Sequence, residues 1–210
     1  MEFEEAVRAR RMVRTYDPGR PVPRQAVHRA LDLALRAPSA GFSQGWDFVV
    51  LSTPAQVETF WTAATGPSPA AADRWLTGLR TAPTLVLCLS DRRRYLERYA
   101  EPDKGWGDPE EQLAQDRWPV PYWDVDTGMA ALLVLLTAVD EGLAGCFFGV
   151  PPARHAAVLE AVAAPARHRV VGVVSLGHPA PDRRSPSLRR GRRPVAEVAH
   201  DGRFGVPFAP

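Results

Sequence analysis

Two stretches, RARRMVR at residues 8–14 and APSAGFSQGW at residues 37–46, decide which fold this sequence predicts. The first stretch places four guanidinium groups where a short amphipathic helix ends. The second is a turn of small, hydroxyl and amide side chains between an amphipathic helix and an apolar strand. Small residues let a flat ligand approach the backbone, and hydroxyl and amide groups offer hydrogen bonds to its edges. Together the stretches indicate an anion site and a turn that contacts a ligand.

The arginine clusters fit a phosphate group, although they also have an ordinary explanation. A phosphomonoester carries nearly two negative charges and is bound bidentately by planar guanidinium groups. Arg10, Arg14, Arg190 and Arg192 supply more charge than a helix end requires. Arginine is, however, the usual cation of this chain, in which Lys104 is the single lysine. On composition alone, solvated surface arginines explain the clusters better, just as a helix stop explains the turn.

Composition predicts a single globular domain over residues 1–210. Hydrophobic residues make up 45% of the chain and charged residues 24%, which is typical of a soluble protein. The net charge is only +2, so no overall field attracts nucleic acid. No charged-then-apolar leader opens the chain, and the longest apolar stretch, 128–139, is too short for a bilayer. We therefore expect a cytoplasmic protein without membrane or nucleic-acid partners.

The sequence offers no motif for a metal site or for a catalytic side chain. Cys88 and Cys146 lie in apolar runs, which predicts buried free thiols rather than a disulfide or a nucleophile. The five histidines are scattered without the spacing of a zinc site. A glycine-rich dinucleotide fingerprint, a phosphate loop and a nucleophile elbow are all lacking.

Hydrophobic periodicity predicts helices and strands in alternation. We expect helices over 2–11, 23–36, 53–64, 91–101, 125–141 and 151–163. We expect strands over 46–51, 84–90, 146–150 and 169–176. Such interleaving predicts a mixed α/β or α+β layered domain. Residues 102–121 show no period and predict a long loop, either functional or partly disordered.

Two segments indicate more than one subunit. The helix over 125–141 is apolar on nearly every side, which is typical of a helix buried all round in a core or at an interface. Residues 180–210 are rich in arginine and proline and are expected to form an arm that wraps over a surface. Because such an arm is hard to close within one chain, we expect a symmetric homodimer with exchanged arms.

The order and spacing of these segments resemble the FMN-dependent nitroreductase family. The segments are RRMVR at 10–14, APSAGFSQGW at 37–46 with the strand after it, GL at 142–143, FFG at 147–149, SLGHP at 175–179 and RGRRP at 190–194. The resemblance covers about residues 2–200. It implies an α+β fold, a three-layer sandwich whose central mixed sheet is flanked by helices, in an intertwined homodimer.

The resemblance also implies which residues bind FMN. Arg10 and Arg11 would hold the phosphate and the ribityl chain, assisted by Arg190 and Arg192. Arg14 would lie near the pyrimidine edge of the flavin ring, where a cation stabilises the reduced anionic form and raises its reduction potential. The other subunit would supply a wall of Pro38, Ser39, Ala40 and Gly41 with Ser43 and Gln44, and Phe148 and Gly149 would bring backbone groups near the reactive face.

Three positions depart from the family pattern. Met12, within the binding segment, stands where the family often has a serine that touches phosphate, so Arg11 or an additional arginine must compensate. Phe42 and Gly45 replace a common asparagine and a common proline. Substrate preference and reductant are therefore open.

By this resemblance the protein is expected to be an FMN-dependent NAD(P)H oxidoreductase. NADH or NADPH would reduce the flavin and leave, and an electron-poor acceptor such as a nitroarene, quinone or enone would follow in a ping-pong mechanism. The cofactor carries this chemistry, so no side chain is expected to act as a catalytic acid or base. Trp106, Trp118, Tyr122 and Trp123 would either line the acceptor pocket or pack at the subunit interface.

Other functions fit the same sequence. A deazaflavin-linked enzyme would use a different reductant, and a flavin-consuming enzyme would destroy the flavin itself. A non-catalytic protein would store or sense flavin. A nucleic-acid contact by the arginine-rich tail is disfavoured, because aromatic interleaving is lacking and the net charge is only +2.

Overall fold

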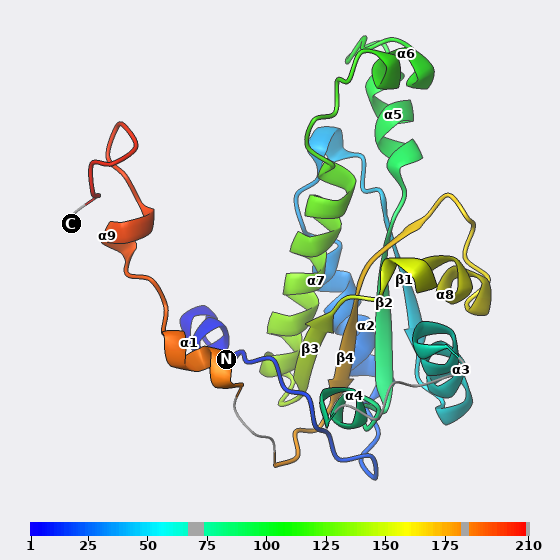
Figure 1. The fold of residues 1–210 in the computed structure, drawn as a ribbon, viewed down its shortest axis with the longest axis vertical. Coiled ribbons are helices and arrows are strands. Elements are labelled where there is room, and N and C mark those ends of the chain that lie inside the picture. Colours follow the sequence, from blue (N-terminus) through cyan, green and yellow to red (C-terminus); the bar gives the residue numbers. More distant parts are fainter. Residues whose placement is uncertain (67–73, 182–184, 209–210) are drawn as a thin grey trace.

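The centre of the molecule is a four-stranded antiparallel sheet (Figure 1). This computed structural model describes residues 1–66, 74–181 and 185–208. The strands lie in the order β1-β2-β4-β3, with bounds Trp46–Leu51 for β1, Thr84–Ser90 for β2, Ala144–Phe148 for β3 and Arg169–Gly177 for β4. A parallel bridge between Met12 and Gly145 adds the N-terminal segment at the β3 edge. The predicted α+β fold is confirmed, but the four strands pair only in antiparallel fashion, so the sheet is not the mixed one that was expected, and the parallel bridge lies outside its strands.

Helices cover both faces of the sheet. Their bounds are Phe3–Ala9 (α1), Arg24–Ala34 (α2), Pro54–Thr65 (α3), Arg74–Leu79 (α4), Arg92–Ala100 (α5), Pro109–Ala114 (α6), Tyr122–Asp140 (α7), His155–Ala161 (α8) and Val195–Val198 (α9). Short 3-10 helices lie at Ala40–Phe42 (η1), Pro152–Arg154 (η2) and Pro186–Arg190 (η3). Local sequence determines where α3 begins: the Thr53 side chain caps the helix, and Pro54 occupies its first turn.

The alternation of side chains along β2 separates two hydrophobic layers. Leu85, Leu87 and Leu89 belong to the core shared with α3 and α8, whereas Val86 and Cys88 belong to the core shared with α2 and α7. Every residue of β2 is buried because helices cover both faces of this strand. The result is the expected sandwich of helices, sheet and helices.

Helix α7 is the main core helix, but within one chain it is not buried all round. Val134 is fully buried, while Val125 and Leu132 are 43% and 47% exposed. Among the described residues, α7 is the one helix long and apolar enough to cross a membrane, and half of its most apolar window is buried inside the protein. Such burial is what a core helix shows. Burial of the exposed apolar residues of α7 at a subunit interface stays a prediction.

Residues 102–121 were predicted to form a loop because they show no hydrophobic period, but they contain helix α6. A capping box starts this helix. The fully buried side chain of Gln112 donates from Nε2 to the carbonyl oxygens of Leu96 and Gly107 and accepts from Nε1 of Trp118. Because both ends of the amide are bonded, Gln112 fixes this segment, here called the cap, onto α5.

The C-terminal residues leave the body of the molecule and extend away from it (Figure 1). No residue of η3 or α9 is buried. Leu188, Val195 and Phe204 are 65%, 63% and 91% exposed. Apolar surface of this kind marks an interaction site. The wrapping of this arm around a partner subunit stays a prediction, and residues 182–184 and 209–210 lie outside the described residues.

Burial predicts that the cysteines are inert. Cys88 and Cys146 are free and buried, as expected, and burial raises the pKa of the Cys88 thiol to about 12. We expect iodoacetamide to leave both thiols of the native protein unmodified near pH 8 and to alkylate both in concentrated guanidinium chloride, as measured by mass spectrometry. Rapid alkylation of the native protein would contradict this packing.

The same shift gives a pH dependence. Burial raises the pKa of the Cys88 thiol from 9.0 in the unfolded chain to about 12 in the folded one. The burial of the neutral thiol therefore stabilises the fold fully below pH 9.0, and the free energy of unfolding falls as the pH rises from 9.0 toward 12.

Candidate functional site

Residues 10–17, which include Arg10, Arg11 and Arg14, lie next to β3 and to the residues that follow β4, where the C-terminal arm begins. The amide of Val13 donates to the carbonyl oxygen of Gly145 at 3.1 Å. The amide of Ala180 donates to the carbonyl oxygen of Thr15, also at 3.1 Å. The first bond holds the N-terminal segment against β3, and the second holds it against the start of the C-terminal arm.

A cavity of about 340 Å³, here called the arginine cavity, lies between these chain ends. Four guanidinium-bearing residues line it, namely Arg10, Arg11, Arg14 and Arg192, and no acidic residue is among its described lining residues. The other lining residues are Met12, Val13, Pro179, Ala180, Ser185, Ser187 and Leu188. Four like charges around one cavity repel one another, so the arrangement favours an anionic ligand.

Arg10 gives the sharpest sign of such a ligand. Its Nη1 atom is buried and has no hydrogen-bond partner among the described residues. Leaving a buried charged N–H unpaired is costly, and almost all such groups in proteins are bonded. A phosphate oxygen would satisfy this donor with a charge-assisted hydrogen bond. The residues of the cavity therefore fit a phosphomonoester.

The cavity contains most, but not all, of the arginines that the sequence singles out. Arg10, Arg11 and Arg14 line it, together with Arg192. Arg190, the last residue of η3, is not among the lining residues, and Gly191 with φ 69° turns the chain between it and Arg192. The assignment of Arg190 to the phosphate therefore stays a prediction.

Two serines of the cavity were missed by the sequence argument. Ser185 and Ser187 bring hydroxyl groups to the lining. Met12 lies along β3, where its sulfur accepts the Phe147 amide at 3.4 Å. The two serines of the arm thus add hydroxyl groups to a cavity in which the side chain of Met12 offers none. In the sequence, the only sign of their role was the presence of serines within an arginine-rich tail.

Residues 38–44, here called the wall segment, contain the six predicted turn residues and lie on a different part of the chain. Asp126, which is 2% exposed, accepts a hydrogen bond from the Ala40 amide at 2.9 Å. The same carboxylate oxygen, Oδ2, accepts the Tyr95 hydroxyl at 2.8 Å. The hydroxyl of Ser43 donates back to the Ala40 carbonyl at 2.7 Å. These bonds tie the segment to α5 and to the start of α7.

The wall segment and the N-terminal residues lie at opposite ends of helix α7 (Figure 1). The wall segment is bonded to Asp126, near the start of the helix, and the chain's N-terminal amine pairs with Asp140 at its end, at 2.7 Å. The interval from residue 126 to residue 140 corresponds to roughly 21 Å of helix. One chain therefore does not bring the two halves of the predicted site together.

Phe148 lies in the core rather than at the arginine cavity. Its ring stacks on Trp61 with centroids 5.5 Å apart and an angle of 8°, and it meets Phe60 edge-on at 6.3 Å. Gly149 follows at the surface. Neither is among the cavity's lining residues, so a role of their backbone at the flavin stays a prediction.

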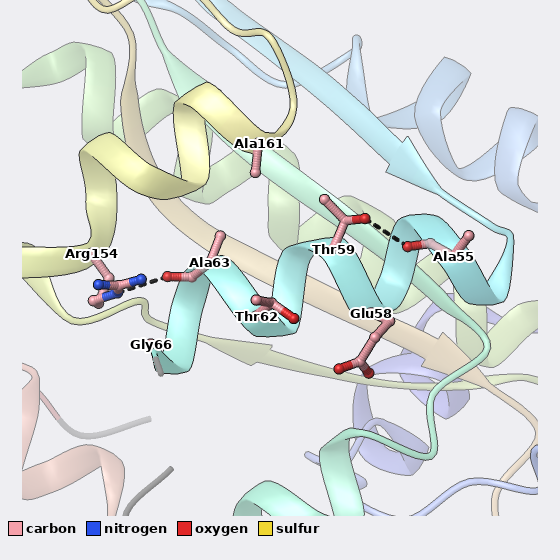
Figure 2. Close-up of a pocket in the computed structure, with 8 residues that line it drawn as sticks. All are labelled: Ala55, Glu58, Thr59, Thr62, Ala63, Gly66, Arg154 and Ala161. Atoms are coloured by element: carbon pink, nitrogen blue, oxygen red, sulfur yellow. Dashed lines mark hydrogen bonds between the residues drawn. The ribbon is translucent and has the colours of Figure 1, made fainter. Parts of the chain in front are cut away.

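A second hollow, of about 620 Å³, lies between α3 and α8 (Figure 2). Its polar groups are largely bonded within the protein. Nε of Arg154 donates to the Ala63 carbonyl at 2.7 Å, and Glu58 pairs with Arg80 at 2.8 Å. Over the described ranges, no cluster of three or more His, Cys, Asp or Glu residues could hold a metal ion. The arginine cavity is thus the stronger candidate site.

Comparison with known families identifies the fold. The Nitroreductase family matches the chain over residues 7–178. This chain belongs to the nitroreductase family. The matched range includes the N-terminal arginines and the wall segment, and it ends before the arm that carries Arg192. None of the curated proteins compared with the chain matches it.

Solved structures of nitroreductases share this architecture. A nitroreductase family protein from Streptococcus pneumoniae has a TM-score of 0.70 at 18% identity, with 95% of this chain and 100% of that chain covered. An FMN-dependent nitroreductase from Clostridium difficile has a TM-score of 0.65 at 18% identity, with 95% and 98% covered. A candidate NAD(P)H:FMN oxidoreductase from Staphylococcus epidermidis has 0.69 at 20%, with 95% of each covered. At these identities the likeness shows the fold.

Packing explains why this chain has a glycine at position 45. A Cβ atom there would lie 2.3 Å from Cε2 of Tyr95 and 2.9 Å from the carbonyl oxygen of Asp91. The backbone of Gly45 also accepts the Asp91 amide at 2.8 Å. The turn therefore lies directly against α5, which leaves no room for a side chain.

We expect Gly45→Ala to lower the free energy of unfolding by roughly 2 kcal/mol or more, because the Tyr95 ring and the Asp91 backbone must both shift. Gly19→Ala is the matched control, since its Cβ would approach only the Asp17 carboxylate, at 3.3 Å. It should change stability by less than about 0.5 kcal/mol. Denaturant unfolding measures both variants, and equal midpoints would contradict the close packing of the turn on α5.

Proposed function

We propose that this protein is a cytoplasmic, homodimeric, FMN-dependent oxidoreductase. It would take hydride from NADH or NADPH and deliver it to an electron-poor acceptor such as a nitroarene, a quinone or an enone. The observation that carries the proposal is the arginine cavity, which arginines from both ends of the chain line and in which Nη1 of Arg10 is buried without a hydrogen-bond partner among the described residues. Family membership and FMN-dependent relatives of the same fold support a flavin as the ligand.

The chain's residues would divide the binding of FMN between them. Arg10, Arg11 and Arg192 would hold the phosphate, with hydroxyls from Ser185 and Ser187 in place of a serine at position 12. FMN, when bound, supplies the hydride chemistry. Arg14 would place positive charge beside the ring, which favours the reduced, anionic form. No side chain is needed as an acid or base, so the protein's part is to bind, to orient and to exclude water.

A second copy of the chain would complete the site. The wall segment and the arginine cavity are separated by α7 within one chain, so the wall for each flavin would come from the partner. Apolar side chains that one chain leaves exposed support this arrangement. They include Phe3 and Val7 on α1, Val125 and Leu132 on α7, and Leu188, Val195 and Phe204 on the arm. Covering such surface is the usual reason for an obligate dimer.

The test is an anaerobic reduction of the protein loaded with FMN. We expect the yellow colour to bleach on addition of NADH or NADPH and to return on addition of a nitroarene or quinone, because both substrates use the same flavin in turn. Stopped-flow absorbance follows both half-reactions. Bleaching only by a reduced deazaflavin, or by no reductant, would contradict the proposed reductant or the enzymatic role.

The Arg10→Ala/Arg192→Ala variant ties this reaction to the cavity. Loss of two charge-assisted contacts to the phosphate should weaken FMN binding by roughly 100-fold. Arg8→Ala is the control, because Arg8 is exposed and pairs with Glu4 on the surface of α1. A double variant that retains FMN as the wild type does would show that the phosphate lies elsewhere.

A further inference from the structure

We infer that one face of α5, formed by Tyr95, Arg98 and Tyr99, is a template that holds the wall segment in its ligand-binding shape and thereby sets flavin affinity. The inference rests on the proposed function, since it concerns how the wall of the flavin site is built. It adds positioning residues that do not themselves line the arginine cavity.

The wall segment adopts a backbone that its sequence does not favour. Gly41, Phe42 and Gln44 have φ values of 61°, 58° and 48°, all in the left-handed region. Glycine tolerates this region, whereas Phe42 and Gln44 are strained in it. Strained residues persist where the surrounding structure over-determines them, and they cluster at ligand-binding sites. Something outside the segment must therefore hold it.

Two tyrosines of α5 supply the surface on which the segment is shaped. Tyr95 and Tyr99 are four residues apart and so lie on the same face of the helix. A Cβ on Gly41 would lie 2.6 Å from Cε2 of Tyr99, and one on Gly45 would lie 2.3 Å from Cε2 of Tyr95. Each ring thus packs directly on the backbone at one end of the turn.

Arg98, between the two tyrosines, bonds to the turn itself. Its Nε donates to the carbonyl oxygen of Gly41 at 2.9 Å. Its two terminal nitrogens donate to the two carboxylate oxygens of Asp103, each at 2.7 Å. This bidentate pair lowers the pKa of Asp103 and fixes the plane of the guanidinium. The arginine therefore presents its Nε–H to the wall segment from a fixed position.

Asp126 closes the arrangement from the side of α7. Its buried carboxylate joins the Tyr95 hydroxyl to the Ala40 amide. Burial, together with this carboxylate, raises the pKa of Tyr95, so the hydroxyl stays protonated and remains a donor. A buried carboxylate with few partners depends strongly on each of them. Loss of the Tyr95 hydroxyl would thus loosen Ala40 as well.

The cap lies behind the template. The ring of Trp118 meets Tyr95 and Tyr99 nearly edge-on, with centroids 6.1 Å and 4.7 Å apart. Trp106 packs against Tyr99 at 4.6 Å. Gln112 then bonds Trp118 to the backbone of α5. Trp106 and Trp118 therefore support α5, and their expected place at the acceptor pocket or at the subunit interface stays a prediction.

The experiment compares FMN binding by the wild type with that by Tyr95→Phe and Arg98→Ala. Tyr95→Phe keeps the ring and removes only the hydroxyl, while Arg98→Ala removes the bond to Gly41. Arg93→Ala is the matched control, because Arg93 is on the same helix, is largely exposed and pairs with Glu97. Flavin fluorescence gives the dissociation constant, and absorbance at saturating FMN gives the spectrum of the bound flavin. Thermal unfolding of the flavin-free protein gives its stability.

We expect both template variants to weaken FMN binding by about tenfold or more and to alter the spectrum of the bound flavin, with Arg93→Ala unchanged. A purely structural role would lower the melting temperature and leave the spectrum at saturation as in the wild type. That result, or unchanged affinity in both variants, would overturn the template while leaving the proposed function intact. If the wild type binds no FMN, the proposed function fails and the template fails with it.

Discussion

Repulsion among four guanidinium groups is the constraint on which this structure depends. Arg10, Arg11, Arg14 and Arg192 line one cavity that has no acidic residue among its described lining. Like charges that line one cavity repel one another unless an anion or water screens them. The backbone bonds of residues 10–17 nevertheless hold them there, and Nη1 of Arg10 is buried without a partner. A doubly charged anion in the cavity would offset this repulsion and would give Nη1 of Arg10 a partner.

The second constraint is the length of α7. The helix spans the molecule from the wall segment to the N-terminal amine, so the two parts of the predicted flavin site cannot meet in one chain. Exposed apolar residues on α1, α7 and the arm follow from the same geometry, because they are the surfaces that a partner would cover. The proposed dimer and the proposed flavin site would then both be consequences of this one arrangement.

The sequence predicted what local patterns determine. Strands β1 and β2 have the expected bounds, because their continuous apolar runs end at clear turn residues. Helix α6 was missed although Asp108 and Glu111 form a capping box, since six residues are too few to show a period. The meeting of Arg10 with Arg192 came from the family resemblance. Contacts such as Tyr99 on Gly41, and the choice of Arg192 over Arg190, depend on tertiary packing that no local pattern contains.

The most direct test of the central claim compares the affinities of the flavin-free protein for FMN and for riboflavin, which lacks the phosphate. Isothermal titration calorimetry at matched ionic strength gives both dissociation constants. If the clustered guanidinium groups anchor the phosphate, FMN binds at least about 100-fold more tightly than riboflavin. Equal affinities would show that the arginines of the two chain ends do not hold the cofactor.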